Sequence, residues 1–203
     1  MIKEIFCYLA NQMKETGLFN LDRVYEYVDL IKTSTSTDSK SYTERPKYYK
    51  GSKAGWIDVM NWDVNGTCYF RKTGKTLFMK KREKWQSCSA NRILEARLPI
   101  RFVACVPKTK LDDSPFMFDQ LAQDLIGVLQ GNYDNLAVDI SAHEVRVDVN
   151  SIETNPNRVW ESEIKGVDFN ESTVQKFVYI SIDFTLIIKG DAGCLQTCLT
   201  NGY

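Results

Sequence analysis

Few residues in this chain have types and spacings that suggest chemistry, and the clearest pattern is Gly74-Lys75-Thr76. The same three residues end the phosphate-binding loop motif, in which backbone amides surround the phosphate oxygens. That motif also requires a glycine five positions before Gly74, and this chain has Tyr69 there. Because the residues between Tyr69 and Gly74 resemble a strand, the pattern predicts a turn between strands and no nucleotide site.

Metal binding and thiol chemistry would have to use the six cysteines and the single histidine of the chain. Cys194 and Cys198 are spaced like a pair of ligands, but no second pair follows, and a structural zinc site needs four ligands. A nucleophilic cysteine would need His143 as its base. The sequence therefore predicts no metal and no cofactor. A small intracellular enzyme with a cysteine nucleophile is an alternative to a protein without enzyme activity. The scattered cysteines are interpreted as buried or idle thiols; they are Cys7, Cys68, Cys88 and Cys105.

Two carboxylate pairs, Asp112-Asp113 and Glu161 with Glu163, have the residue types for acid–base catalysis. The first pair precedes an expected helix, where negative charge is favourable without any reaction. The second pair falls in a stretch that we interpret as a polar loop. We therefore predict no catalytic residue and no enzyme activity.

Basic and aromatic side chains are interspersed in one polar segment, and such residues are common at interfaces. A second basic group, from Lys80 to Lys84, lies beside Trp85. We predict that the first segment is a docking arm. A nucleic-acid-binding module is the other alternative, because lysines also contact phosphates. The candidate docking residues are Tyr42, Arg45, Tyr48, Tyr49, Lys50 and Trp56.

The elements that position these groups begin with a helix. Apolar residues recur at helical spacing from Ile2 to Met13, which predicts a helix over residues 2–15 with Gly17 as its cap. Residues 18–32 fit either period, and their β-branched and aromatic content favours a strand. Residues 33–55 are polar and rich in Ser and Thr. Since loops of this length are uncommon in compact domains, we predict a projecting arm that is mobile when the protein is alone.

A β-meander is predicted for residues 56–86. Asn65-Gly66 lies between two strand-like segments, which is a strong signal for a hairpin. Thr73-Gly74-Lys75 supplies a second turn, after which residues 76–79 return as a strand.

A long strand and an amphipathic helix are predicted between Arg92 and Gly131. Even positions from Leu94 to Val106 are apolar and the first odd positions are polar, which is typical of a strand with one buried face. Ser114-Pro115 suits the start of a helix. Apolar residues then follow at helical spacing from Phe118 to Leu129, with Gly131 in place for a left-handed cap.

Two strands around a polar stretch are predicted for the last third of the chain. Alternation over residues 136–142 resumes one residue out of phase over residues 145–149, which predicts a bulge or break near residue 143. Residues 150–173 are polar, and residues 174–188 form a second long half-buried strand. The candidate subunit interface consists of Trp85 and the apolar residues on the other face of this strand, Phe177, Tyr179 and Ile187.

Bulk properties limit the class of protein. The 203 residues fit one domain with a substantial core, and 26 basic residues balance 26 acidic ones, which argues against a general polyanion binder. No segment approaches the ~20 apolar residues of a membrane span, so no membrane partner is expected. We predict one α+β domain over residues 1–190 and a tail over residues 191–203. Its antiparallel sheet would be flanked by two helices and carry the polar arm of residues 33–55.

The order of these elements resembles the tail-terminator and neck-ring proteins of tailed bacteriophages. The resemblance rests on the sequence from Leu98 to Val103 (LPIRFV), on Asp112-Asp113-Ser114 before the helix, on Trp160, and on the closing strand Phe177 to Ile188. The run VYISIDFTLIIKG before Cys194 and Cys198 is most similar to ring proteins of crAss-like phages. The match covers roughly residues 92–190 and includes no invariant motif.

The resemblance implies a structural subunit without enzyme activity, and it transfers no catalytic residue. Such subunits form closed rings, sixfold or twelvefold, between portal and tail around the DNA channel. The expected partners are copies of this chain, other neck, portal or tail proteins, and nearby DNA. The expected location is the virion, and the host cytoplasm during assembly. The insertion over residues 33–55 departs from the compact terminators and leaves the position within neck or tail open.

Overall fold

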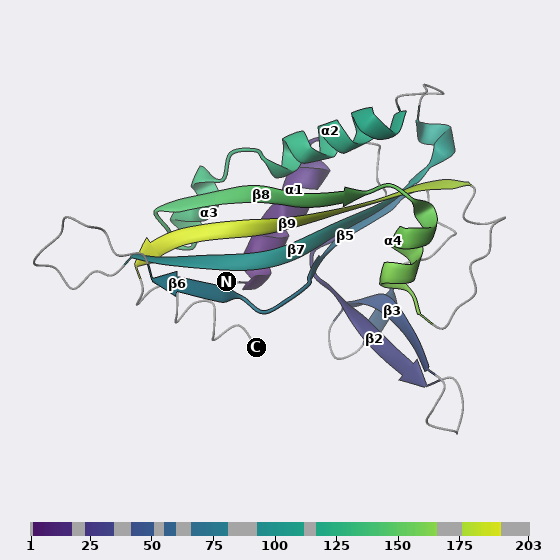
Figure 1. Ribbon diagram of the computed structural model, residues 1–203, viewed down its shortest axis with the longest axis horizontal. Coiled ribbons are helices and arrows are strands. Elements are labelled where there is room, and N and C mark those ends of the chain that lie inside the picture. Colours follow the sequence, from purple (N-terminus) through teal and green to yellow (C-terminus); the bar gives the residue numbers. More distant parts are fainter. Residues whose placement is uncertain are drawn as a thin grey trace, which may run out of the picture.

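The computed structural model describes residues 2–17, 23–34, 42–50, 55–59, 66–80, 93–111, 117–165 and 176–191. Within these ranges the chain forms two β-sheets and four α-helices, which confirms the predicted α+β class (Figure 1). The main sheet contains β1 (Arg23–Tyr25), β5 (Thr67–Lys72), β6 (Leu77–Lys80), β7 (Ile93–Pro107), β8 (Glu144–Glu153) and β9 (Phe177–Asp191). The small sheet contains β2 (Val28–Ser34), β3 (Tyr42–Tyr49) and β4 (Trp56–Asp58). The helices are α1 (Ile2–Glu15), α2 (Met117–Leu129), α3 (Asp134–Asp139) and α4 (Pro156–Glu163).

The two long predicted strands, β7 and β9, form the centre of the main sheet. They pair antiparallel over their whole length, from Ile93 opposite Asp191 to Pro107 opposite Phe177. Their even positions face a large apolar cluster, here called the first cluster, to which α1, α2 and α3 also contribute. Each large side chain buried there stabilises the fold by about 1.5–3 kcal/mol. The predicted α1 is confirmed, and Gly17 follows it in the left-handed conformation with φ 61°.

Some odd positions of β7 and β9 are covered as well. Val103 and Cys105 of β7 pack with Tyr179 of β9 and with Val159 and Trp160 of α4 in what we call the second cluster. The prediction of one wet face on β7 is therefore wrong at its C-terminal end. The reason is α4, a helix that the sequence reading assigned to a polar loop.

The segment predicted as a mobile arm over residues 33–55 contains a strand. Residues 42–49 form β3, which pairs antiparallel with β2 on one side and with β4 on the other. Figure 1 shows this small sheet extending away from the end of the main sheet that lies opposite β6. The predicted absence of secondary structure is wrong at β3, whose sequence YTERPKYY has no apolar period that would have identified a strand. Residues 35–41 and 51–54 lie outside the described ranges.

The predicted β-meander is wrong in its pairing. Residues Thr67–Tyr69 of β5 pair with β1 on one edge and with β7 on the other. The segment expected to pair with β5 through a turn at Asn65-Gly66 lies outside the described residues. Strands β5 and β6 instead lie one after the other along the same edge of β7. Residues 73–76 interrupt them opposite Pro99, which has no backbone N–H to offer a neighbouring strand.

The strand predicted over residues 136–142 is also wrong. Residues 134–139 form α3, with Leu136 buried on it and Ile140 buried just after it. The break near residue 143 is confirmed as the boundary between this helix and β8, and Ser141 there has φ 53°. The helix α2 agrees with its prediction, although Ser114-Pro115 lies outside the described residues. Gly131 is not left-handed, and its N–H donates to the Val128 carbonyl at 3.2 Å, so the predicted glycine cap is wrong.

Candidate functional site

The most concentrated group of charged side chains in the described residues is organised by α4. The Asn155 side chain caps this helix by accepting hydrogen bonds from the backbone N–H groups of Asn157 and Arg158, and Pro156 occupies its first turn. Val159 and Trp160 then face the second cluster. This Asn-Pro start is the signal that could have identified the helix from the sequence.

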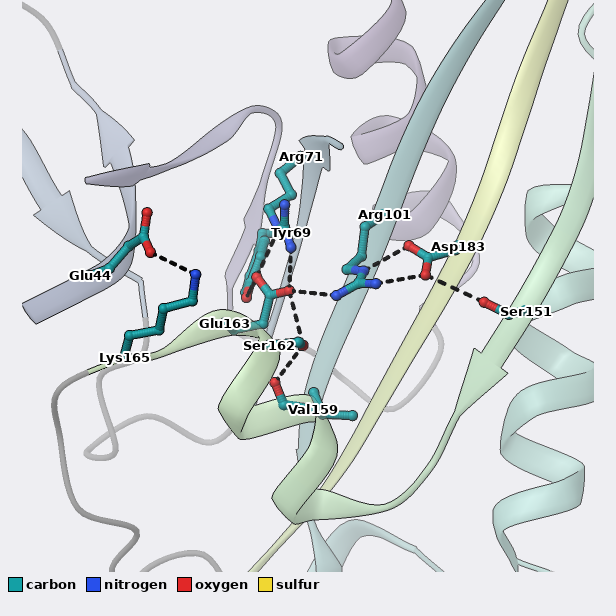
Figure 2. A network of polar contacts seen from close by, with 10 residues as sticks. All are labelled: Glu44, Tyr69, Arg71, Arg101, Ser151, Val159, Ser162, Glu163, Lys165 and Asp183. Atoms are coloured by element: carbon teal, nitrogen blue, oxygen red, sulfur yellow. Dashed lines mark hydrogen bonds and ion pairs between the residues drawn. The ribbon is translucent and has the colours of Figure 1, made fainter. Parts of the chain in front are cut away.

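Glu163, at the end of α4, carries a fully buried carboxylate. Figure 2 shows Tyr69 and Arg71 from β5 and Arg101 from β7 converging on it. The Arg71 guanidinium donates to both carboxylate oxygens, at 2.8 and 2.7 Å, and the Tyr69 hydroxyl donates at 2.9 Å. The Arg101 guanidinium adds a contact of 3.2 Å. These donors satisfy a charge whose burial alone would be costly.

Arg101 extends the network across the sheet. Its guanidinium donates to both oxygens of Asp183 on β9, at 2.7 and 2.6 Å, and these bonds raise the Arg101 pKa above its ordinary value. The Ser151 hydroxyl of β8 donates to Asp183 at 3.3 Å. Two arginines therefore face two carboxylates. Burial, together with the charge of Glu163, holds the Tyr69 pKa well above its usual range. This balanced network is suited to holding elements together.

The small sheet is joined to this network through the residue that follows α4 by two positions. The backbones of Lys165 and Glu44 exchange hydrogen bonds of 2.9 and 3.0 Å, and their side chains form an ion pair of 3.1 Å. Val28 and Tyr48 of the small sheet also pack on the second cluster. The end of α4 thus contacts both sheets, as Figure 2 shows.

The predicted docking residues separate into two groups. The Tyr48 ring turns inward and lies 5.2 Å from the Tyr25 ring. Tyr49 and Trp56 are directly opposite each other in the β3–β4 pair, their rings are 5.1 Å apart, and they are 49% and 42% exposed.

The other docking residues lie along the same small sheet. Arg45 bonds Asp58 at 3.2 Å on the edge strand β4. The Lys50 N–H donates to the Gly55 carbonyl at 3.0 Å, beside the exposed aromatic pair. Tyr42 is the first residue of β3 and pairs with Ser34.

The predicted subunit-interface residues on β9 are buried within the single chain. Phe177, Tyr179 and Ile187 are 9%, 0% and 1% exposed, so their side chains are occupied within the chain. The element that covers Tyr179 is α4, whose Trp160 ring meets the Tyr179 ring edge-on. Trp85 lies outside the described residues.

The thiols of the described residues have pKa values above the ordinary value. Burial raises the pKa of Cys105 to about 12, and burial with the neighbouring Glu26 raises that of Cys7 to about 11. Burial likewise raises the pKa of Cys68. His143 lies beside Asp191, with 3.4 Å between Nε2 and the carboxylate oxygen. Cys88, Cys194 and Cys198 lie outside the described residues.

The other sequence candidates are also placed. Gly74 and Lys75 lie in the interruption between β5 and β6, and Tyr69 is buried where a phosphate loop needs glycine. Glu161 is exposed on α4, while Asp112-Asp113 lies outside the described residues. Among the residues described, no group of His, Cys, Asp and Glu side chains is arranged to hold a metal ion, and no helix is long and apolar enough to cross a membrane.

Protein-family models give no match to this chain, and a search of curated proteins finds no significant match.

Proposed function

We propose that this protein is a structural ring subunit of a bacteriophage neck or tail, of the tail-terminator or connector type. In this proposal it assembles into a closed homo-oligomeric ring around the DNA channel between portal and tail. Its partners are copies of itself and other neck, portal or tail proteins, with channel DNA nearby, and its place is the virion.

The main support is a small sheet that projects from the main sheet and exposes an aromatic pair. Tyr49 and Trp56 are 49% and 42% exposed at the end of the β3–β4 pair. Aromatic residues beside basic ones are the usual energetic centres of protein interfaces. An exposed pair on a projection therefore suits docking to a neighbouring protein.

The charged side chains around Glu163 bond to one another, which supports a role without catalysis. Glu163, Arg71, Arg101 and Asp183 are bonded to one another, and these bonds join α4 to the main sheet. A general acid or base needs access to a substrate proton. The Glu163 carboxylate is fully buried and faces only its own donors.

The proposal is tested by the mass and shape of the purified full chain. Mass photometry and negative-stain images should give one uniform ring with sixfold or twelvefold symmetry, either alone or with the portal and tail proteins of the same particle. A chain that stays monomeric under both conditions and is absent from purified virions would overturn the proposal. Salt-dependent retention of DNA by that monomer would favour the nucleic-acid-binding alternative.

A further inference from the structure

We propose that neighbouring copies join through the two edges of the main sheet, with β8 of one copy pairing antiparallel to β6 of the next. This inference rests on the proposed ring function and names the surface that closes the ring. The two edges differ in chemistry, and the contact is therefore head-to-tail, as a closed ring requires.

Among the described strands, β6 lies at an edge of the main sheet and exposes apolar side chains. Its Leu77, Phe78 and Met79 are 60%, 38% and 38% exposed, and β7 is its one partner among the described strands. Protein edges normally avoid association by charges, prolines, bulges or a covering element. Three consecutive exposed apolar residues on an edge instead indicate a surface that another strand covers.

The strand directions allow the sheet to continue without interruption. At this end of the molecule Leu77 of β6 is opposite Arg97, Arg97 is opposite Ile187, and Ile187 is opposite Arg146 of β8. Each of these neighbours is antiparallel to the next, so β6 and β8 run in opposite directions. A second copy in the same orientation therefore presents its β8 antiparallel to β6 and keeps the alternation of the sheet.

Charge also favours contact between unlike edges. From Lys72 to Lys80 every charged residue is a lysine, whereas β8 contains Glu144, Asp148 and Glu153 with a single arginine. Although Glu144 bonds Lys189 of its own chain, Asp148 is half exposed, with 3.9 Å between its carboxylate and Arg146. The acidic edge of β8 is thus the better complement to the basic edge of β6.

A disulfide between different molecules tests this contact. Within one chain β6 and β8 are three strand spacings apart, or about 14 Å, too far for a disulfide, whose Cα atoms lie about 4.4–6.8 Å apart. Leu77→Cys protein would be mixed with Arg146→Cys or Asp148→Cys protein and oxidised with glutathione. We expect a disulfide-linked dimer well above the level of the unaltered chain. The matched control is Ile152→Cys, an exposed position on β8 beyond its bulge.

The outcomes distinguish a failure of the edge contact from a failure of the ring function, because ring assembly is measured in the same samples as the crosslink. Rings without the Leu77–Arg146 or Leu77–Asp148 crosslink overturn the edge contact and leave the ring function standing. Crosslinking of Leu77→Cys protein with itself overturns the contact in favour of two β6 edges. Absence of any assembly contradicts the ring function and this contact together.

A second variant tests the contact without cysteines. Phe78→Asp should weaken self-association roughly 30-fold or more, the effect of losing one interface hot spot. Its circular dichroism and thermal midpoint should stay close to those of the unaltered chain, since Phe78 is 38% exposed in the single chain. Val138→Asp, at a residue 77% exposed on α3, is the control and should assemble normally. Equal assembly of both variants contradicts the proposal.

Discussion

The two faces of the main sheet are held by different physical means. The first cluster joins α1, α2 and α3 to the even positions of β7 and β9 through apolar side chains. The second cluster combines apolar side chains with a buried ionic network around Glu163 and connects α4 and the small sheet. The first face gains stability in proportion to the apolar area it buries. On the second face the ionic contacts fix how the elements lie relative to one another, because each charged group must meet its own partner.

The polar contacts of the second cluster fix the relative positions of its elements more closely than the apolar contacts of the first cluster do. An apolar face tolerates small shifts if volume is kept. A bidentate arginine–carboxylate pair fixes both distance and direction. The small sheet contacts α4 next to that pair, at Lys165 and Glu44. The orientation of the proposed docking surface is therefore set by polar contacts.

The largest expected effect comes from the first cluster. Phe102 is fully buried, with its ring 5.0 Å from that of Phe70. Phe102→Ala should lower the free energy of unfolding by about 3–5 kcal/mol through lost burial and a cavity. Urea unfolding followed by circular dichroism measures the loss. A loss under ~1 kcal/mol would show that the first cluster does not dominate stability.

Glu163→Gln tests the second cluster. The variant keeps the shape of the side chain but leaves Arg71 and Arg101 without their shared negative charge, which should cost about 3 kcal/mol. Hydrogen exchange should rise mainly in α4, β3 and β5, since local units open separately. Glu161→Gln, at an exposed position on the same helix, is the matched control. Uniform exchange throughout the chain would contradict the separation of the two clusters.

Two buried thiols report on the two clusters individually. Cys68 lies in the first cluster and Cys105 in the second. In Glu163→Gln protein, a thiol-reactive probe followed by peptide mass spectrometry should label Cys105 faster and Cys68 at an unchanged rate. Equal acceleration of both thiols would mean that the clusters open together.

The pH dependence of Cys105 has a definite sign. Burial raises its pKa from 9.0 to about 12. The thiol stays protonated in the folded chain, so its contribution to stability is complete below pH 9 and is lost as pH rises from 9 towards 12. Cys105→Ala should therefore flatten the fall in urea midpoint above pH 9. An unchanged slope would assign that fall to other groups.

The smallest effect is expected at the link between α4 and the small sheet. The Lys165 side chain is 56% exposed, so its ion pair with Glu44 is screened by water. Lys165→Ala should lower stability by less than about 1 kcal/mol, because the backbone hydrogen bonds to Glu44 remain. The thermal midpoint measures this change. A loss as large as that of Glu163→Gln would show that the small sheet is held mainly by this surface pair and not by the buried network.

Periodicity alone was enough for the first cluster. The helical spacing from Ile2 to Met13 and the alternation along residues 94–106 and 177–188 identified α1, β7 and β9. These signals are local, since each repeats within one element. The error at residues 136–142 came from a short pattern that fits two structures equally well.

The pattern of apolar residues was enough to predict that two long half-apolar strands and amphipathic helices build an α+β core. The burial of Glu163 could be seen only in the folded chain, because its partners Arg71 and Arg101 are 92 and 62 residues away in the sequence. The folded chain also shows that Tyr179 is covered by α4 while Tyr49 and Trp56 are exposed. Local patterns report which face of an element is apolar, but the element that covers a face is chosen by contacts between distant parts of the chain.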